Sequence, residues 1–116
     1  MLIRVDMASG APLFEQVAAS VRADIVAGSL APGDRLPSAR EVAETLDINL
    51  HTVLHAYQRL RDEGLIDLRR GRGAVVSDSV GPLAALTTEL RALVARAGEL
   101  GVAPATLAAL VKEIAV

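Results

Sequence analysis

The chain of 116 residues contains no cysteine and no tryptophan, and only one phenylalanine and one tyrosine. Without cysteine there can be no disulfide, no thiolate metal site and no cysteine nucleophile. The core must therefore be aliphatic, built from Leu, Val, Ile and Ala. An apolar run of roughly 18 residues, which a membrane span needs, is also lacking. The N-terminus, MLIRVDMASG, does not have the pattern of a signal peptide, so we expect a cytoplasmic protein with no membrane partner.

Positive charge is also in short supply. Twelve basic residues face fourteen acidic ones, which gives a formal net charge of −2. Residues 1–78 contain nine arginines and eleven acidic residues, and residues 79–116 are balanced at three of each. Only a local arrangement of arginines could therefore attract a polyanion.

The first predicted helix runs from Pro12 to about Ala27, and Gly28 is expected to end it as a left-handed cap. Before it, residues 2–5 could form a short strand. The apolar stripe of the helix recurs every four residues and consists of Leu13, Val17, Val21 and Ile25.

Two further helices follow in close succession. Ser38 with Glu41 three residues later is a capping box, which predicts a short helix that ends near Asp47. Asn49 is a favoured N-cap and starts the next helix, which Gly64 closes. Two helices separated by about three residues are typical of a helix-turn-helix. The buried stripe expected on the second of them consists of Val53, Ala56, Tyr57 and Leu60.

Most of the clustered positive charge lies in LRRGRGAVV, residues 68–76. Residues 65–68 and 74–77 are typical of short strands, and Gly71 and Gly73 supply the positive φ that a tight hairpin tip needs. A β-hairpin directly after a helix-turn-helix is a wing.

Residues 77–82 are expected to form a linker, and beyond it apolar residues step by three and four as in a coiled coil. This tail cannot bury two apolar faces by itself. We favour a dimer seam, and the alternative is a monomer whose tail folds back. The seam is formed by Leu83, Leu86, Leu90, Leu93, Ala97 and Leu100, and by Leu107, Leu110, Val111 and Ile114 on a last helix that starts at Pro104. The fold class is thus mainly α with a small β wing (α+β), with a winged helix-turn-helix in residues 1–78 and a two-helix dimerisation tail in residues 79–116.

The second helix of the pair would present its first turn to the major groove of double-stranded DNA. Asn can bond adenine, Thr can reach a phosphate or a base, and Leu can touch a thymine methyl. Arg40 is long enough to reach a phosphate or a guanine, and Gly71 lets its backbone N–H approach a phosphate. The candidate DNA contacts are Arg40, Asn49, Leu50, His51, Thr52, His55, Arg69, Arg70, Gly71 and Arg72.

Several of these residues have other readings. His51 and His55 have the i,i+4 spacing of metal ligands, but no third ligand accompanies them, so we expect no metal and no cofactor. Arg40 could pair with Glu44 on the helix surface. Leu54 could complete the edge of the core.

The run from Pro12 to Ser77 resembles the DNA-binding domain of the GntR family of bacterial transcription regulators. Its most specific parts are PGDRLPSAREVA, TV..AYQRLRDEGLI and RRGRG. The tail, with ARAGELGV, resembles that of the YtrA subfamily, whose C-terminal region is two helices without a large effector domain. The resemblance implies a winged helix-turn-helix and a homodimer on a palindromic operator.

Position by position, the resemblance places the family's base-contacting arginine at Arg40. It places the recognition-helix contacts at residues 49–52 and the wing contacts at Arg70 and Gly71. The chain departs from the family at Asp47, where Gly is usual, and in NLHT, where NPNT is common in the subfamily. These departures leave the operator sequence open.

The function expected from this pattern is a sequence-specific transcription regulator that acts as a homodimeric repressor. The alternative is a winged-helix module that binds another protein through Leu50 and Leu54. No group of residues supports an enzyme, because Ser38 and His51 are explained by capping and exposure. The sequence leaves open whether a small-molecule effector exists.

Overall fold

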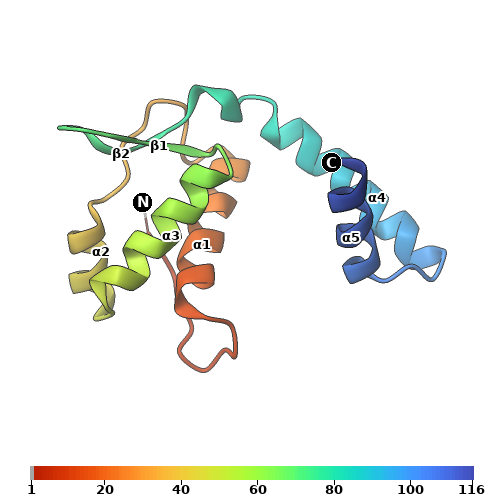
Figure 1. Ribbon diagram of the computed structural model, residues 1–116, viewed down its shortest axis with the longest axis horizontal. Helices are drawn as coiled ribbons and strands as arrows, with labels where there is room; N and C mark the ends of the chain where they lie inside the picture. Colours follow the sequence, from red (N-terminus) through yellow and green to blue (C-terminus); the bar gives the residue numbers. More distant parts are fainter. Residues whose placement is uncertain (1) are drawn as a thin grey trace. The chain divides into compact units, whose positions relative to one another are not determined.

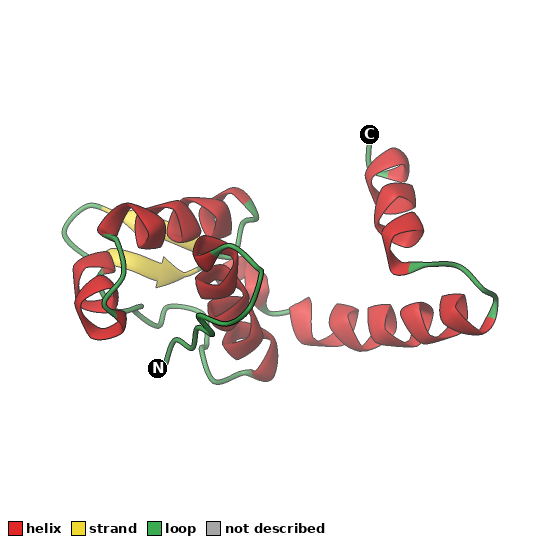
Figure 2. Ribbon diagram, turned by 90° about the horizontal axis from the view of Figure 1, so that it is seen from below, coloured by secondary structure: helices red, strands yellow, loops and turns green. Residues whose placement is uncertain are grey.

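A computed structural model describes residues 2–116 of the chain (Figure 1). It forms two compact units, the first ending at Pro82 and the second running from Leu83 to Val116. Within these residues no helix is long and apolar enough to cross a membrane. The predicted fold class, mainly α with a small β hairpin, is confirmed (Figure 2). The elements are α1 (Leu13–Ala27), α2 (Ala39–Leu46), α3 (Leu50–Asp62), β1 (Ile66–Arg69), β2 (Gly73–Val76), the 3-10 helix η1 (Asp78–Val80), α4 (Leu83–Glu99) and α5 (Pro104–Ile114).

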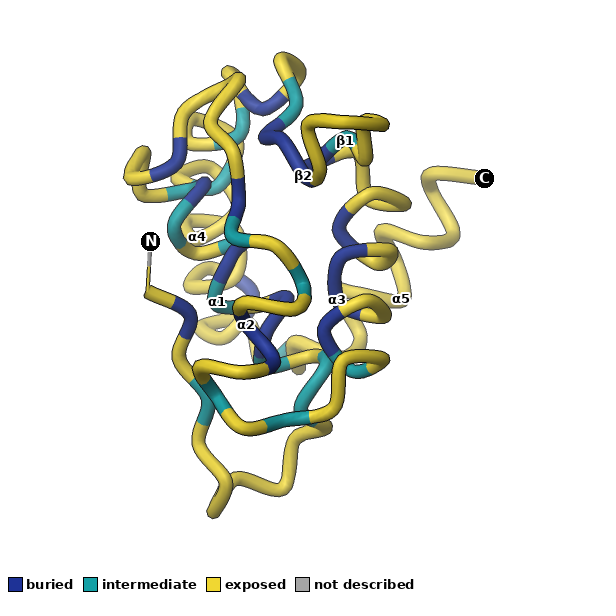
Figure 3. Tube along the Cα trace, turned by 90° about the vertical axis from the view of Figure 1, so that its left-hand side faces the viewer, coloured by how far each residue is buried: buried dark blue, intermediate teal, exposed yellow. Residues whose placement is uncertain are grey.

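The core of the first unit lies where α1 and α2 pack against α3. On α1, Val17 and Val21 are completely buried, whereas Leu13 at its start is only half-buried. On α3, the four predicted core positions are all buried (Figure 3). Gly28 ends α1 with φ at 83°, which confirms the predicted left-handed cap.

The turn between α2 and α3 is also formed as predicted. The Ser38 hydroxyl accepts a hydrogen bond from the Glu41 N–H at 3.1 Å and caps α2. Asp47 ends α2 with φ at 53°, a left-handed conformation that Asp adopts more readily than most residues. The Asn49 side chain then accepts from the His51 N–H and caps α3. The direction of α3 is therefore set by three local devices that the sequence displays.

The wing is an antiparallel hairpin in which Ile66 lies opposite Val76 and Arg69 opposite Gly73. Gly71 and Gly73 have φ of 80° and 72°, as predicted for its tip. A third segment, residues 33–36, lies along β2: the Leu36 N–H donates to the Ala74 carbonyl, and the Val76 N–H donates to the Asp34 carbonyl. The sequence predicts a turn at Pro32 and Gly33 and an extended Leu36 before Pro37. It does not predict the pairing with β2, which spans about forty residues of chain and leaves no local signal.

Two other segments differ from their predictions. Residues 2–5 form no strand. The Arg4 N–H instead donates to the Ser20 hydroxyl on α1, and Ile3 is buried. Residues 77–82 are not a plain linker, because they contain η1, whose Val80 is buried.

In the second unit, α4 and α5 pack against each other across a turn at Gly101, whose φ is 79°. Ala97 is the one buried residue among those of this unit. Ala97 belongs to the predicted seam, so this position is covered within the unit itself, and Leu83 and Leu107 are half-buried. The other predicted seam residues are exposed. The exposed fractions are 57% for Leu86, 49% for Leu90, 50% for Leu93, 71% for Leu100, 44% for Leu110 and 82% for Ile114.

Candidate nucleic-acid interface

The exposed side of the helix-turn-helix brings Arg40 and Leu50 into one surface region. Both residues line a shallow hollow of about 410 Å³, together with Glu44 and Asp47. Arg40 is exposed, and it forms no ion pair with Glu44 or any other described residue. The pairing with Glu44, given above as an alternative, is therefore absent from the free chain, and Arg40 is open to solvent.

The first turn of α3 carries four of the predicted contact residues. The Oδ1 of Asn49 accepts from the His51 N–H at 2.8 Å, so this oxygen already holds the helix start, while the amide N–H groups of Asn49 can still donate. Leu50 and His51 are exposed and Thr52 is half-buried. The structure thus presents the first turn of α3 at the surface, and its contacts with bases stay a prediction.

His55 has a partner that the sequence did not predict. Its imidazole stacks on the Phe14 ring of α1, with the ring centroids 3.9 Å apart and the planes 16° from parallel. The guanidinium of Arg59 lies 5.5 Å from the same ring. The single phenylalanine of the chain therefore lies beside two basic side chains of α3 rather than in the core. Any contact of His55 with DNA would come from a ring held by this stack.

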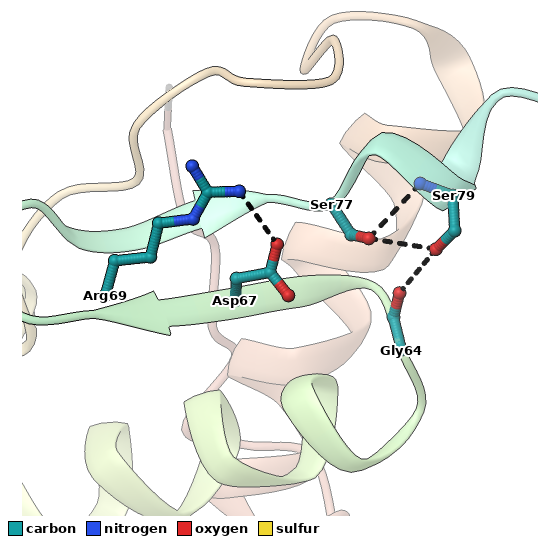
Figure 4. A network of polar contacts seen from close by, with 5 residues as sticks. All are labelled: Gly64, Asp67, Arg69, Ser77 and Ser79. Carbon is teal, nitrogen blue, oxygen red and sulfur yellow. Dashed lines mark hydrogen bonds and ion pairs between the residues drawn. The ribbon is translucent and has the colours of Figure 1, made fainter.

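The arginines of the wing are in different environments. Arg69, on β1, lies 3.3 Å from the Asp67 carboxylate of the same strand, which neutralises part of its charge (Figure 4). Arg70 and Arg72 flank Gly71 at the tip, and all three are exposed. Neither Arg70 nor Arg72 has an ion-pair partner among the described residues. The free positive charge of the wing is therefore concentrated at its tip.

The base of the wing is tied to the end of α3 by a small polar network that sequence reasoning missed. The Ser79 hydroxyl donates to the Gly64 carbonyl at 3.1 Å and lies 2.9 Å from the Ser77 hydroxyl (Figure 4). The Ser77 N–H donates to the Leu65 carbonyl at 3.0 Å. These bonds join the two ends of the hairpin, so they fix the wing relative to α3.

A second anchor holds the start of α2 against α3. The Tyr57 hydroxyl donates to the Pro37 carbonyl at 2.6 Å. Burial, reinforced by the nearby charge of Glu41, raises the pKa of the Tyr57 phenol above its usual value, so the hydroxyl keeps its proton. The one tyrosine of the chain therefore acts as a hydrogen-bond donor that positions α2.

Within residues 2–116, no group of three or more His, Cys, Asp and Glu residues is arranged to hold a metal ion. His51 and His55 share one helix, but His55 is stacked on Phe14. What the first unit does display is a supported first turn of α3, an unpaired Arg40 and an arginine-rich tip. Helix termini, arginines and exposed backbone N–H groups are the parts that protein–DNA interfaces use.

Comparison with known proteins identifies the family to which these elements belong. Residues 13–76, from the start of α1 to the end of β2, match the family described as "Bacterial regulatory proteins, gntR family". The HTH-type transcriptional repressor YtrA of Bacillus subtilis is 34% identical over 119 residues, which cover 97% of this chain and 92% of that protein.

Solved structures agree with the sequence match. YtrA from Sulfolobus acidocaldarius, a GntR-family transcription factor, superimposes with a TM-score of 0.64 and 39% identity, covering 80% of this chain and 98% of that chain. The N-terminal domain of AraR, in a crystal structure with mutant ORR3, superimposes with a TM-score of 0.55 and 25% identity, over 58% of this chain and 96% of that chain. The chain belongs to the gntR family of bacterial regulatory proteins and is a DNA-binding transcription regulator.

Proposed function

We propose that this regulator is a homodimeric repressor that binds a palindromic operator. The observation that carries the proposal is the pairing of two features in one short chain. The first unit presents the first turn of α3 and an arginine-rich wing tip, and the second presents a row of exposed leucines. The repressor YtrA of Bacillus subtilis, which is similar along nearly the whole chain, supports repression rather than activation.

In this proposal α3 enters the major groove of the operator. Arg40 contacts a guanine edge or a phosphate, and Asn49, Leu50, His51 and Thr52 face the bases, with His55 one turn further on. Good base contacts contribute about 1–3 kcal/mol of discrimination each. The strength of binding then depends on the particular base pairs, which is what a sequence-specific regulator requires.

The wing supplies contacts that do not depend on sequence. Arg70 and Arg72 would lie along the phosphates or in the minor groove, where the negative potential is strongest. The backbone N–H of Gly71 can approach a phosphate because no side chain stands in front of it. Arg69 contributes less, since Asp67 already shares its charge.

Dimerisation is assigned to the second unit. A single wing domain makes few phosphate contacts, and a second half-site multiplies the affinity. The exposed face of α4 and α5 would become the seam between two chains, through Leu83, Leu86, Leu90, Leu93, Leu100, Leu107, Leu110 and Ile114. Two first units would then occupy half-sites roughly 10 bp apart, or a near multiple, on one face of the duplex.

Repression would follow from occupancy alone, because a dimer on the operator blocks polymerase. The proposal requires no catalytic activity and no cofactor. It places the protein in the cytoplasm, where the bacterial chromosome lies. The proposal does not require an effector for binding, and the seam between two chains is the place where one would be sought.

The test is selection of bound duplexes from a random DNA library by the purified full chain, followed by sequencing. We expect a palindromic consensus with fixed spacing. A matched selection with Arg40→Ala should give a weaker consensus that has lost information at one position of each half-site. Arg4→Ala, which removes an exposed arginine far from α3 in the sequence, should leave the consensus unchanged. Failure of the unmodified chain to enrich any sequence would contradict the proposed function.

A further inference from the structure

Helix α3 carries a leucine on its exposed side that the core does not use. Leu54 is 38% exposed, although α3 buries its neighbours Val53 and Ala56 completely. Leu50, one turn earlier, is 36% exposed. Residues four apart lie on the same face of a helix, so Leu50 and Leu54 form one apolar edge in the part of α3 assigned to the major groove. Leu54 was also considered as an edge of the core, and its exposed fraction shows that a large part of its surface stays accessible.

Leu54 also lines a hollow that lies beside this edge. The hollow has a volume of about 430 Å³ and is formed between α3, the start of α2 and the wing. Leu68 of β1, which is 43% exposed, lines the same hollow. The lining combines small and branched apolar side chains with two arginines, and includes Ala39, Leu54, Leu68, Arg69, Arg70 and Ala74.

This combination decides between two kinds of occupant. An apolar segment of another protein would be matched by the leucines but not by the two arginines at the same place. A DNA strand matches both, because its phosphates pair with arginine, and thymine displays a methyl group in the major groove. That methyl is the apolar group that a base pair presents there, and an exposed leucine on α3 is complementary to it.

We propose that Leu54 is a specificity-determining residue that reads the 5-methyl group of one thymine in each half-site, with the strand that carries it lying beside the hollow lined by Leu68 and Arg70. The proposal rests on the proposed function, since it requires α3 to enter the major groove. It assigns to Leu54 a contact one helical turn beyond the thymine contact predicted for Leu50.

The geometry of α3 also sets the spacing of the two thymines. Four residues of helix rise by about 6 Å, and successive base pairs are about 3.4 Å apart. The thymines contacted by Leu50 and Leu54 should therefore lie within about two base steps of each other. A half-site read in this way contains a short thymine-rich element.

The experiment replaces each thymine of the selected operator by deoxyuridine, symmetrically in both half-sites, which removes only the methyl group. Affinity is measured with the full chain and with Leu54→Ala. At one position the substitution should weaken binding of the unmodified chain by about fourfold per half-site, the value of one buried methyl group. The same substitution should leave binding of Leu54→Ala unchanged.

Two further variants sharpen the test. Binding of Leu50→Ala should be insensitive to deoxyuridine at a different thymine, which lies within about two base steps of the first. Leu2→Ala removes another exposed leucine, 65% exposed on the N-terminal segment, and should keep both sensitivities. Alanine is the strongest helix former, so Leu54→Ala should unfold in urea at nearly the concentration of the unmodified chain.

If the unmodified chain binds its operator and no thymine shows an effect that Leu54→Ala abolishes, the proposal is overturned while the proposed function stands. If the library selection yields no operator, the proposed function itself has failed, and the thymine contact fails with it.

Discussion

The two units of the chain use similar apolar patterns with opposite results. In the first unit the stripes of α1 and α3 face each other, and Val17, Val21, Val53 and Leu60 have no exposed surface. In the second unit the leucines of α4 are spaced just as regularly, yet Leu86, Leu90 and Leu93 are each about half exposed. Periodicity therefore predicts that an apolar helix face will be buried. It does not say whether the residues that bury it belong to the same chain.

This contrast suggests a division of roles. The first unit buries its own apolar faces and presents polar and basic groups at its surface, which suits a rigid DNA-binding module. The second unit does not bury its own leucines, which suits an interface between copies. The predictions below test that division, starting with the largest expected effect.

Leu60→Ala should lower the free energy of unfolding by about 2–5 kcal/mol, because Leu60 on α3 is fully buried. Leu93→Ala is the matched change in the second unit. The loss in free energy of unfolding caused by Leu93→Ala should be small in dilute protein. It should grow with protein concentration, because Leu93 stabilises the dimer. Urea unfolding at two protein concentrations measures both. An equal loss for the two variants in dilute protein would mean that Leu93 is packed within one chain.

Arg40→Ala should weaken operator binding by about 1–3 kcal/mol and binding to scrambled DNA only slightly. The reason is that an unpaired arginine beside the first turn of α3 is placed to contact a base. Fluorescence anisotropy on the two duplexes gives the ratio, with Arg4→Ala as the control. An equal loss on both duplexes would show that Arg40 only holds a phosphate.

Arg70→Ala should have the smallest effect on specificity and a clear effect on salt dependence. Each phosphate contact adds about 0.9 to the slope of log K against log salt, so this variant should lower the slope by about that amount per half-site. Arg69→Ala should lower it less, because Asp67 lies 3.3 Å from the Arg69 guanidinium. A slope that Arg70→Ala leaves unchanged would remove Arg70 from the phosphate contacts.

The features that could be predicted from the sequence are those set within a few residues. Gly28, Ser38, Asp47 and Asn49 each end or start a helix through their own backbone or side chain, and the structure confirms all four. The wing was predicted for the same reason, since its tip needs glycine.

The features that were missed depend on contacts between distant segments. Pairing of residues 33–36 with β2, burial of Val80, and stacking of His55 on Phe14 all join parts of the chain that no local pattern connects. Residues 2–5 show the converse case. A short strand was predicted there, but these residues form none, and the Arg4 N–H donates to the Ser20 hydroxyl of α1 instead.

The central claim is that two first units, joined through the second, read two half-sites together. The most direct measurement is sedimentation velocity of the full chain, 12.1 kDa, with duplexes that carry either two half-sites or one. We predict two chains on the full palindrome and much weaker binding to the single half-site. Leu93→Asp, which places a charge in the seam, should remove that difference. One chain per duplex, with equal affinity for both duplexes, would contradict the account.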